Sequence, residues 1–298
     1  ELACNYDEEA NTNNGSCDYI CYDIDNSLSF DGANTYVEIP HNNQLNLENE
    51  GFTIFTRVMF KAFEDQRRHQ ILTKSEGSGG NKKWIFGLPN INSGGQGPGG
   101  STNGLVFHSH TGGNDRFYAR SNEFTPELYK WYDIAVSSEN GNYTFYIDGN
   151  YWGLDEGYNN VLSNNADLLI GAKEPNEPWD IHSLDGNIDE LVIWNTYLTA
   201  EQIFDISYNG DDINSYDIEP DNIVANWQFN QHNSGELNNE YLVDESGNQN
   251  HGIIYGAEWV ENPLSEGCTD PLAENYNSEA TIDNGSCNGI VDSEDFTY

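Results

Sequence analysis

Residues 184–210, LDGNIDELVIWNTYLTAEQIFDISYNG, constrain the fold most strongly because three local signals follow one another without a gap. An acidic turn comes first, and the β-branched and aromatic run 188–194 then predicts a strand. Thr199 and Gln202 have the spacing of a capping box, which predicts a short helix that begins there. Gly210 is a residue suited to follow the end of that helix.

This stretch resembles the end of the laminin-G-like jelly roll of the concanavalin A-like lectin/glucanase superfamily, whose pattern is close to G-x-I-D-E-V-x-I-W-N-x-x-L-[ST]-x-x-E-I. The matching residues are Gly186, Ile188, Asp189, Glu190, Ile193, Trp194, Asn195, Leu198, Thr199 and Ile203. Segments 27–40 and 223–259 resemble other parts of the same domain. The resemblance implies an all-β fold, a two-sheet antiparallel jelly-roll β-sandwich with about six strands in each sheet.

The segment 52–60 has the alternation of a strand with two apolar faces, and we therefore expect it to lie in the middle of a sheet. One face would carry Phe52, Ile54, Thr56, Val58 and Phe60, and the other Thr53, Phe55, Arg57 and Met59. The clearest hairpin signal is Asp148-Gly149-Asn150, between the strands predicted at 143–147 and 151–152.

The two ends of the chain repeat each other. Residues 3–17 (ACNYDEEANTNNGSC) align without gaps to residues 273–287 (AENYNSEATIDNGSC). The unit resembles the short "CTDPxAxNY…DNGSC" repeats of Bacteroidetes-type secreted and surface proteins. We therefore expect a partial repeat at 1–22, the jelly roll at 23–264 and a second repeat with a tail at 265–298, as one bead of a longer string.

All five cysteines lie in these ends, which favours an oxidising, extracellular setting over metal binding. Each repeat is too small to bury a core, so a disulfide is expected. We predict Cys268–Cys287, worth about 3 kcal/mol in the chain-entropy description. At the other end we predict Cys4–Cys21, with Cys4–Cys17 as the competing pairing.

The charge balance excludes several partners. With 11 basic and 50 acidic residues the net charge is −39, so neither nucleic acid nor an anionic membrane surface is a suitable partner. No apolar run is long enough for a membrane span. Two interpretations stay open and are compatible: solubility in a salty medium, or dedicated Ca²⁺ sites built from carboxylates.

The resemblance also implies a structural Ca²⁺ ion as cofactor, where the first strand of the domain meets the last. The matching positions are the Asp31-Gly32 turn and Asp189. The alternative is that Asp31 only caps its own turn and Asp189 is an ordinary strand residue.

Exposed aromatic and polar side chains near the Gly-rich stretch 89–104 are candidates for sugar binding. They are Trp84, Arg116, Tyr118, Arg120, Trp152 and Trp179. The alternatives are that such aromatic residues belong to the core and that the Gly-rich stretch is a plain surface loop.

No catalytic pattern is present. The E-x-D-x-x-E spacing of the superfamily's glucanases is absent, and His108-Ser109-His110 is interpreted as two polar strand residues rather than a metal site. We expect a non-enzymatic, secreted or cell-surface module that binds an extracellular polysaccharide or glycan. The alternatives are a structural spacer or fibre subunit that contacts neighbouring domains of the same surface protein, and an accessory domain of a secreted glycoside hydrolase.

Overall fold

The computed structural model describes most of the sandwich and parts of the C-terminal repeat. The described residues are 26–47, 51–63, 69–77, 82–89, 104–112, 115–158, 161–172, 183–209, 219, 222–230, 240–262, 266–268, 273–276, 282–283 and 286–289. Cys4, Cys17, Cys21 and Trp179 lie outside these residues, as do Gly210 and most of the Gly-rich stretch. The predictions made for them stay predictions.

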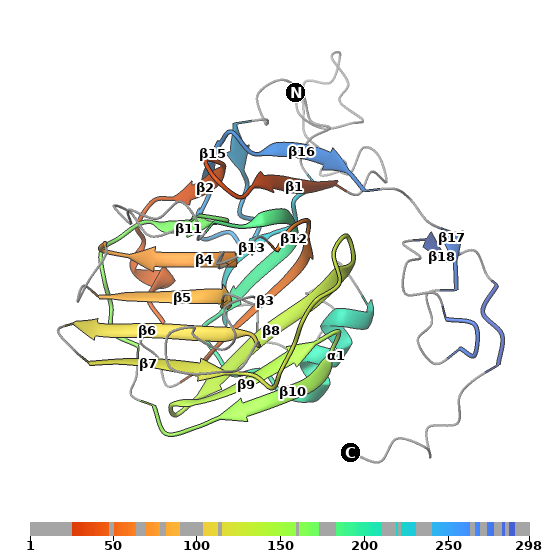
Figure 1. Cartoon of the computed structure of the whole chain (residues 1–298), viewed down its shortest axis with the longest axis horizontal. Coiled ribbons are helices and arrows are strands. Elements are labelled where there is room, and N and C mark those ends of the chain that lie inside the picture. Colours follow the sequence, from red (N-terminus) through yellow and green to blue (C-terminus); the bar gives the residue numbers. More distant parts are fainter. Residues whose placement is uncertain are drawn as a thin grey trace, which may run out of the picture.

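Two antiparallel sheets of eight strands each form the sandwich (Figure 1). Sheet A has the order β10 (Asn150–Asp155), β9 (Asn142–Ile147), β8 (Trp131–Glu139), β3 (Gly51–Phe60), β12 (Asp185–Trp194), β1 (Asn26–Asp31) and β16 (Glu258–Glu261), with β13 (Ile223–Trp227) also paired to β12. Sheet B has the order β14 (Tyr241–Leu242), β15 (Gly252–Tyr255), β2 (Tyr36–Ile39), β11 (Leu168–Ile170), β4 (His69–Ser75), β5 (Lys83–Leu88), β6 (Val106–Gly112) and β7 (Asp115–Arg120). A 3₁₀ turn, η1 (Asn43–Leu45), follows β2.

The all-β two-sheet prediction is confirmed, but the expected number of strands was too small. The sheets hold eight strands each because the short segments β13 to β16, from the last third of the sandwich, add to both of them. The central position predicted for 52–60 is correct, since β3 pairs with β8 on one side and β12 on the other. Its two faces are as predicted: Phe52 and Ile54 lie in the core between the sheets, and Phe55 lies on the outer face.

The helix predicted from the capping box is α1 (Ala200–Asn209). The backbone N–H of Gln202 donates to Oγ1 of Thr199 (3.3 Å), and the backbone N–H of Thr199 donates to Oε1 of Gln202 (3.0 Å). Ile203 and Ile206 of α1 are buried with Trp194 in a second apolar cluster on the outer face of sheet A. None of the helices in the described residues could span a bilayer.

A bulge in β12 sets which of its residues face the core. Glu190 has φ +45° and interrupts the pairing with β3 between Asp189 and Leu191. After the bulge, Leu191 and Ile193 point into the core between the sheets. Val192 and Trp194 therefore point outward, where α1 covers them.

The segment DESGNQNHG, within the stretch that resembles part of the jelly roll, is structural here. The carboxylate of Asp244 accepts hydrogen bonds from the backbone N–H groups of Asn226 (2.8 Å), Ser246 (3.0 Å) and Asn250 (2.9 Å). The indole N–H of Trp227 donates to the carbonyl of Asn250 (2.9 Å). This buried network ties the loop to β13 and leaves Asp244 engaged by the chain itself.

The C-terminal repeat holds the predicted disulfide, Cys268–Cys287, with an S–S distance of 2.08 Å. Two short strands, β17 (Glu266–Gly267) and β18 (Ile282–Asp283), form a parallel pair within it. The side chain of Asn275 donates to the carbonyl of Ser286 and accepts from the backbone N–H of Asn288, both at 2.8 Å. These bonds and the disulfide replace the core that so short a segment cannot build.

Candidate functional site

Three neighbouring strands of sheet B place nine side-chain positions on its outer face in register. Lys83 of β5 pairs with His110 of β6, and His110 pairs with Arg116 of β7. The next two rows are Ile85–His108–Tyr118 and Gly87–Val106–Arg120. We call these nine positions the β5–β7 grid. Directly paired residues share a face, so each row is a set of side-by-side neighbours.

The alternation of the strands explains why these residues point outward. The residues between them, Trp84, Phe86, Phe107, Phe117 and Ala119, are buried in the core between the sheets. Because side chains alternate along a strand, burying these five directs the charged and polar positions to the other face.

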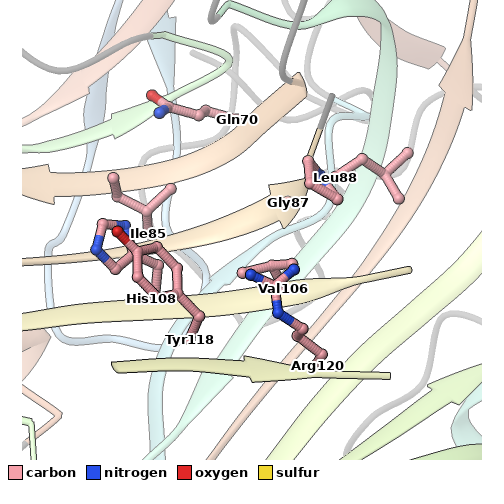
Figure 2. A pocket seen from close by; sticks show the side chains of 9 residues that line it. Gln70, Ile85, Gly87, Leu88, Val106, His108, Tyr118 and Arg120 are labelled. Carbon is pink, nitrogen blue, oxygen red and sulfur yellow. The ribbon is translucent and has the colours of Figure 1, made fainter. Parts of the chain in front are cut away.

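A small pocket lies over part of the grid (Figure 2). It is lined by Gln70, Ile85, Gly87, Leu88, Pro89, Val106, His108, Tyr118 and Arg120. Its volume is about 40 Å³, room for a few waters or one functional group of a larger ligand. Gly87 is required where the wall meets β4, because a Cβ atom there would lie 2.1 Å from the carbonyl oxygen of His69.

The polar side chains of the pocket are held by stacking and charge. The rings of Tyr118 and His108 stack with centroids 4.1 Å apart and planes at 17°. The guanidinium carbons of Arg120 and Arg116 lie 5.6 Å and 5.9 Å from the centroid of the Tyr118 ring. Figure 2 shows the guanidinium of Arg120 extending from β7 toward Val106, while Tyr118 lies against His108.

The backbone of β7 at Arg120 is anchored from β10. Its N–H donates to Oδ2 of Asp155 (3.0 Å), and the same oxygen accepts from the hydroxyl of Tyr158 (2.9 Å). Burial and this bond to Asp155 raise the pKa of Tyr158 to about 12, so it stays a donor at neutral pH. Burial lowers the pKa of Arg120, but a guanidinium keeps its charge in proteins.

His110 lies beside two cations in its row of the grid. Burial, Lys83 and Arg116 together lower the pKa of His110, which favours its neutral form at pH 7. The ring of His108 is 4.9 Å from that of His110. Among the described residues, no group of three or more His, Cys, Asp or Glu is placed to hold a metal ion, and the pair gives no sign of a metal site.

The structure brings together three of the six predicted sugar-binding residues. Arg116, Tyr118 and Arg120 are neighbours on the outer face of β7. Trp84 was wrongly predicted, since it has 0% of its surface exposed and packs with Phe107 in the core. Trp152 lies on β10 of sheet A, and its indole N–H is already bound to the carbonyl of Glu123 (3.1 Å).

Sequence reasoning missed Gln70, Ile85 and Gly87 as pocket residues and interpreted His108 as a polar strand residue with no binding role. The alternation Val106, His108, His110 along one strand was a usable signal for a shared outward face. No sequence signal indicated Gln70, because its place in the pocket depends on the pairing of β4 with β5.

The two carboxylates predicted to share a calcium ion are not brought together. Asp31 pairs with Asp185 and Leu28 with Ile188, so Asp189 stands four residues farther along β12 than the partner of Asp31. That offset is about 13 Å, too far for one ion to bind both carboxylates. Calcium binding at either position stays a prediction.

Asp31 instead caps its own turn with Gly32, as in the alternative interpretation. Its Oδ1 accepts from the backbone N–H groups of Ala33 (2.8 Å), Asn34 (2.9 Å) and Thr35 (3.2 Å). Burial raises the pKa of Asp31, but these hydrogen bonds outweigh it and the pKa is lowered overall. Asp189 is buried, and its Oδ2 lies 3.3 Å from the amide nitrogen of Asn262.

Comparison with known structures gives the same architecture. A candidate carbohydrate-binding protein from Bacteroides ovatus aligns with a TM-score of 0.55 and 16% identity over 80% of this chain and 60% of that protein. The fourth domain of an extracellular arabinanase from Geobacillus stearothermophilus, solved with arabinotriose, aligns with a TM-score of 0.46 and 19% identity over 61% of this chain and 76% of its own. At 16% identity the first likeness concerns the fold alone, and at a TM-score of 0.46 the second carries no argument.

No curated protein matches the sequence. The profile of the "Concanavalin A-like lectin/glucanases superfamily" matches residues 31–204, which is more than half of the chain. Both the matched segment and the two-sheet antiparallel sandwich agree with that family. The chain therefore belongs to the concanavalin A-like lectin/glucanase superfamily.

Proposed function

We propose that this chain is a non-catalytic, extracellular glycan-binding module and that the pocket on the outer face of sheet B is where it binds sugar. The observation that carries the proposal is the convergence of Tyr118, His108, Gln70 and Arg120 on one pocket. The similarity to a candidate carbohydrate-binding protein supports the proposal.

The chemistry of the pocket suits a saccharide. Sugars present apolar ring faces and many hydroxyl groups, which aromatic rings and amide or guanidinium groups can contact. Tyr118 is already stacked on His108, so little side-chain entropy would be lost when a ligand arrives. The small volume fits one group of a sugar that otherwise lies along the surface.

A binding role is favoured over hydrolysis by the residues of the pocket. Glycoside hydrolysis usually needs two carboxyl groups about 5–9.5 Å apart on either side of the scissile bond. None of the nine residues that line the described pocket is acidic. The absence of the E-x-D-x-x-E spacing from the sequence supports the same conclusion.

The proposal can be tested by measuring affinity for a polysaccharide panel with wild-type protein and the Tyr118→Ala variant. We expect retention on at least one polysaccharide and about tenfold weaker binding by the variant. Tyr151→Ala is the matched control, because Tyr151 is 58% exposed on β10 of sheet A. Equal binding by wild type and Tyr118→Ala would remove the pocket from the proposal, and release of reducing sugars would overturn the non-catalytic role.

Extracellular location and a stabilising calcium ion are further parts of the proposal. The Cys268–Cys287 disulfide supports the first, since such bonds persist in oxidising compartments. Calcium has weaker support because Asp31 and Asp189 are separated along the strands. Thermal unfolding with Ca²⁺ and with EDTA tests it, and identical midpoints would exclude a structural ion.

A second function, as a spacer or fibre subunit, is favoured by the C-terminal repeat. Tyr276 of the repeat lies 6.3 Å, centroid to centroid, from Tyr208 of α1, so the repeat contacts the sandwich rather than hanging from it. Light scattering of the purified chain tests this role, since a concentration-dependent rise in mass is expected of a fibre subunit.

An accessory role within a secreted glycoside hydrolase would require the same pocket and a catalytic partner domain.

A further inference from the structure

Arg120 is half-buried, and two of its charged hydrogen-bond donors are not used. Both terminal nitrogens of its guanidinium are buried, and neither has a hydrogen-bond partner anywhere in the chain as described. The ring of Tyr118 lies beside the charged group, with its centroid 5.6 Å from the guanidinium carbon. Leaving charged donors buried and unpaired is costly, so such a group calls for a physical explanation.

Intramolecular pairing does not supply that explanation. Asp155, whose charge acts on Arg120, binds the backbone N–H of Arg120 and the hydroxyl of Tyr158 through the same oxygen, Oδ2. None of the described residues that line the pocket carries a negative charge. The pocket is thus a mainly apolar cavity with a cation in its wall and no acidic residue among the described residues that line it.

The surroundings of Arg120 add positive charge. Arg116 stands two positions away on the same face of β7 and is exposed. Lys83 and His110 complete the row of the grid that contains Arg116, two rows from that of Arg120. The whole chain carries only 11 basic residues against 50 acidic ones, so three cations within nine positions are a local reversal of its charge.

We infer that the pocket binds a carboxylate or sulfate group of an acidic polysaccharide, with the guanidinium of Arg120 as its principal partner. Two parallel N–H groups of a guanidinium match the two oxygens of either anion. The cavity has room for one such group of a polysaccharide that otherwise stays outside it. The inference rests on the proposed glycan-binding function and names the chemical class of the glycan.

The net charge of −39 does not prevent this interaction. At physiological ionic strength the Debye length is about 8 Å, so acidic residues far from the pocket are largely screened. A buried ion pair is screened much less. Binding of a polyanion to so acidic a protein would therefore report a specific site rather than general attraction.

The test compares polysaccharides that share a backbone and differ in charge. De-esterified and methyl-esterified pectin form one such pair, and carboxymethyl dextran, dextran sulfate and plain dextran form another set. We expect wild-type protein to bind at least one acidic member about tenfold or more tightly than its neutral counterpart. Preference for the carboxylated or the sulfated member identifies which anion the pocket accepts.

Variants assign the preference to Arg120. Arg120→Gln should reduce affinity for the acidic polysaccharide about tenfold or more, and Arg120→Lys should retain part of it because the charge remains. Lys130→Gln is the matched control, since it also removes one positive charge but lies before β8, with its ammonium 5.1 Å from the Tyr132 ring. Circular dichroism and thermal unfolding check that each variant is folded. The comparison of acidic with neutral polysaccharides uses wild-type protein alone, so it stands even if a variant does not fold.

The outcomes separate this inference from the proposed function. If a neutral polysaccharide binds as tightly as its acidic counterpart, or if Arg120→Gln folds and keeps full affinity for the acidic one, glycan binding stands and the inference fails. If no member of the panel binds to folded wild-type protein, both fail.

Discussion

The outer faces of the two sheets differ in composition and in what covers them. On sheet A, Phe55, Tyr146, Val192 and Trp194 form an apolar surface that α1 buries. On sheet B, the β5–β7 grid carries lysine, arginine, histidine and tyrosine around a pocket. Burying the first surface stabilises the fold. On the second, Lys83, His108 and His110 are also buried, whereas Arg116 is exposed, and buried polar side chains need partners. One face therefore serves stability and the other is suited to recognition.

The largest expected effect comes from removing the apolar surface under α1. Trp194→Ala should lower the free energy of unfolding by about 3–5 kcal/mol because Trp194 is fully buried in that cluster. Glycan affinity should stay unchanged, since the pocket lies on the opposite sheet. Urea unfolding and a binding assay measure the two quantities, and a loss below about 1 kcal/mol would contradict the stabilising role of this face.

A smaller effect on the free energy of unfolding is expected at the polar margin of the sheet A face. There Asp133 of β8 pairs in register with Arg57 of β3. Burial raises the pKa of Asp133 to about 6, although Arg57 opposes the shift. The folded state then binds a proton more tightly than the unfolded state, whose pKa is near 3.8. This group's contribution to stability is full below about pH 3.8 and is lost as the pH rises through about 6.

Asp133→Asn should remove this pH dependence, which amounts to at most about 3 kcal/mol between pH 4 and pH 6.5. Unfolding curves across that range, for wild type and variant, give the measurement. Glu139→Gln is the control, because Glu139 is exposed at the end of the same strand. Parallel pH profiles for wild type and Asp133→Asn would show that Asp133 titrates normally.

The smallest expected loss of stability comes from destabilising the N-terminus of α1 alone, which tests whether the outer faces of the two sheets are independent. Thr199→Ala removes the side-chain half of the capping box and should cost about 1 kcal/mol of stability, whereas Thr199→Ser should cost much less. Neither change should alter glycan binding. Reduced binding by Thr199→Ala under conditions where it is fully folded would show that the two faces are coupled.

The fold was predictable to the extent that it depends on local patterns. The capping box, the strand at 52–60 and the hairpin at Asp148-Gly149 were all found where the sequence indicated. The hairpin turn has φ values of +48° and +70°, as an Asp-Gly turn permits. The C-terminal disulfide was also predictable, because a short repeat with two cysteines has few other ways to hold its shape.

The site was only partly predictable, and Trp84 shows why. Trp84, Phe86 and Leu88 lie at every second position of one strand, so they share a face, and this pattern favoured a core position for Trp84. The residue type, however, suggested stacking on a sugar. Arg116, Tyr118 and Arg120, which the sequence named only as candidates near the Gly-rich stretch, share one face of β7 because side chains alternate along a strand. Their partners from β4, β5 and β6 could not be named in advance, because strand register is a long-range property.

The sequence by itself determined the local elements and the family, since both follow from short-range patterns of apolar, turn and capping residues. The tertiary structure decided which residues face which environment. The bulge at Glu190 turns Leu191 and Ile193 inward and Val192 and Trp194 outward, a switch that simple alternation does not predict. The pairing of β5, β6 and β7 likewise places Arg120 beside Gly87 and Val106, and only that long-range register creates a pocket with a cation in its wall.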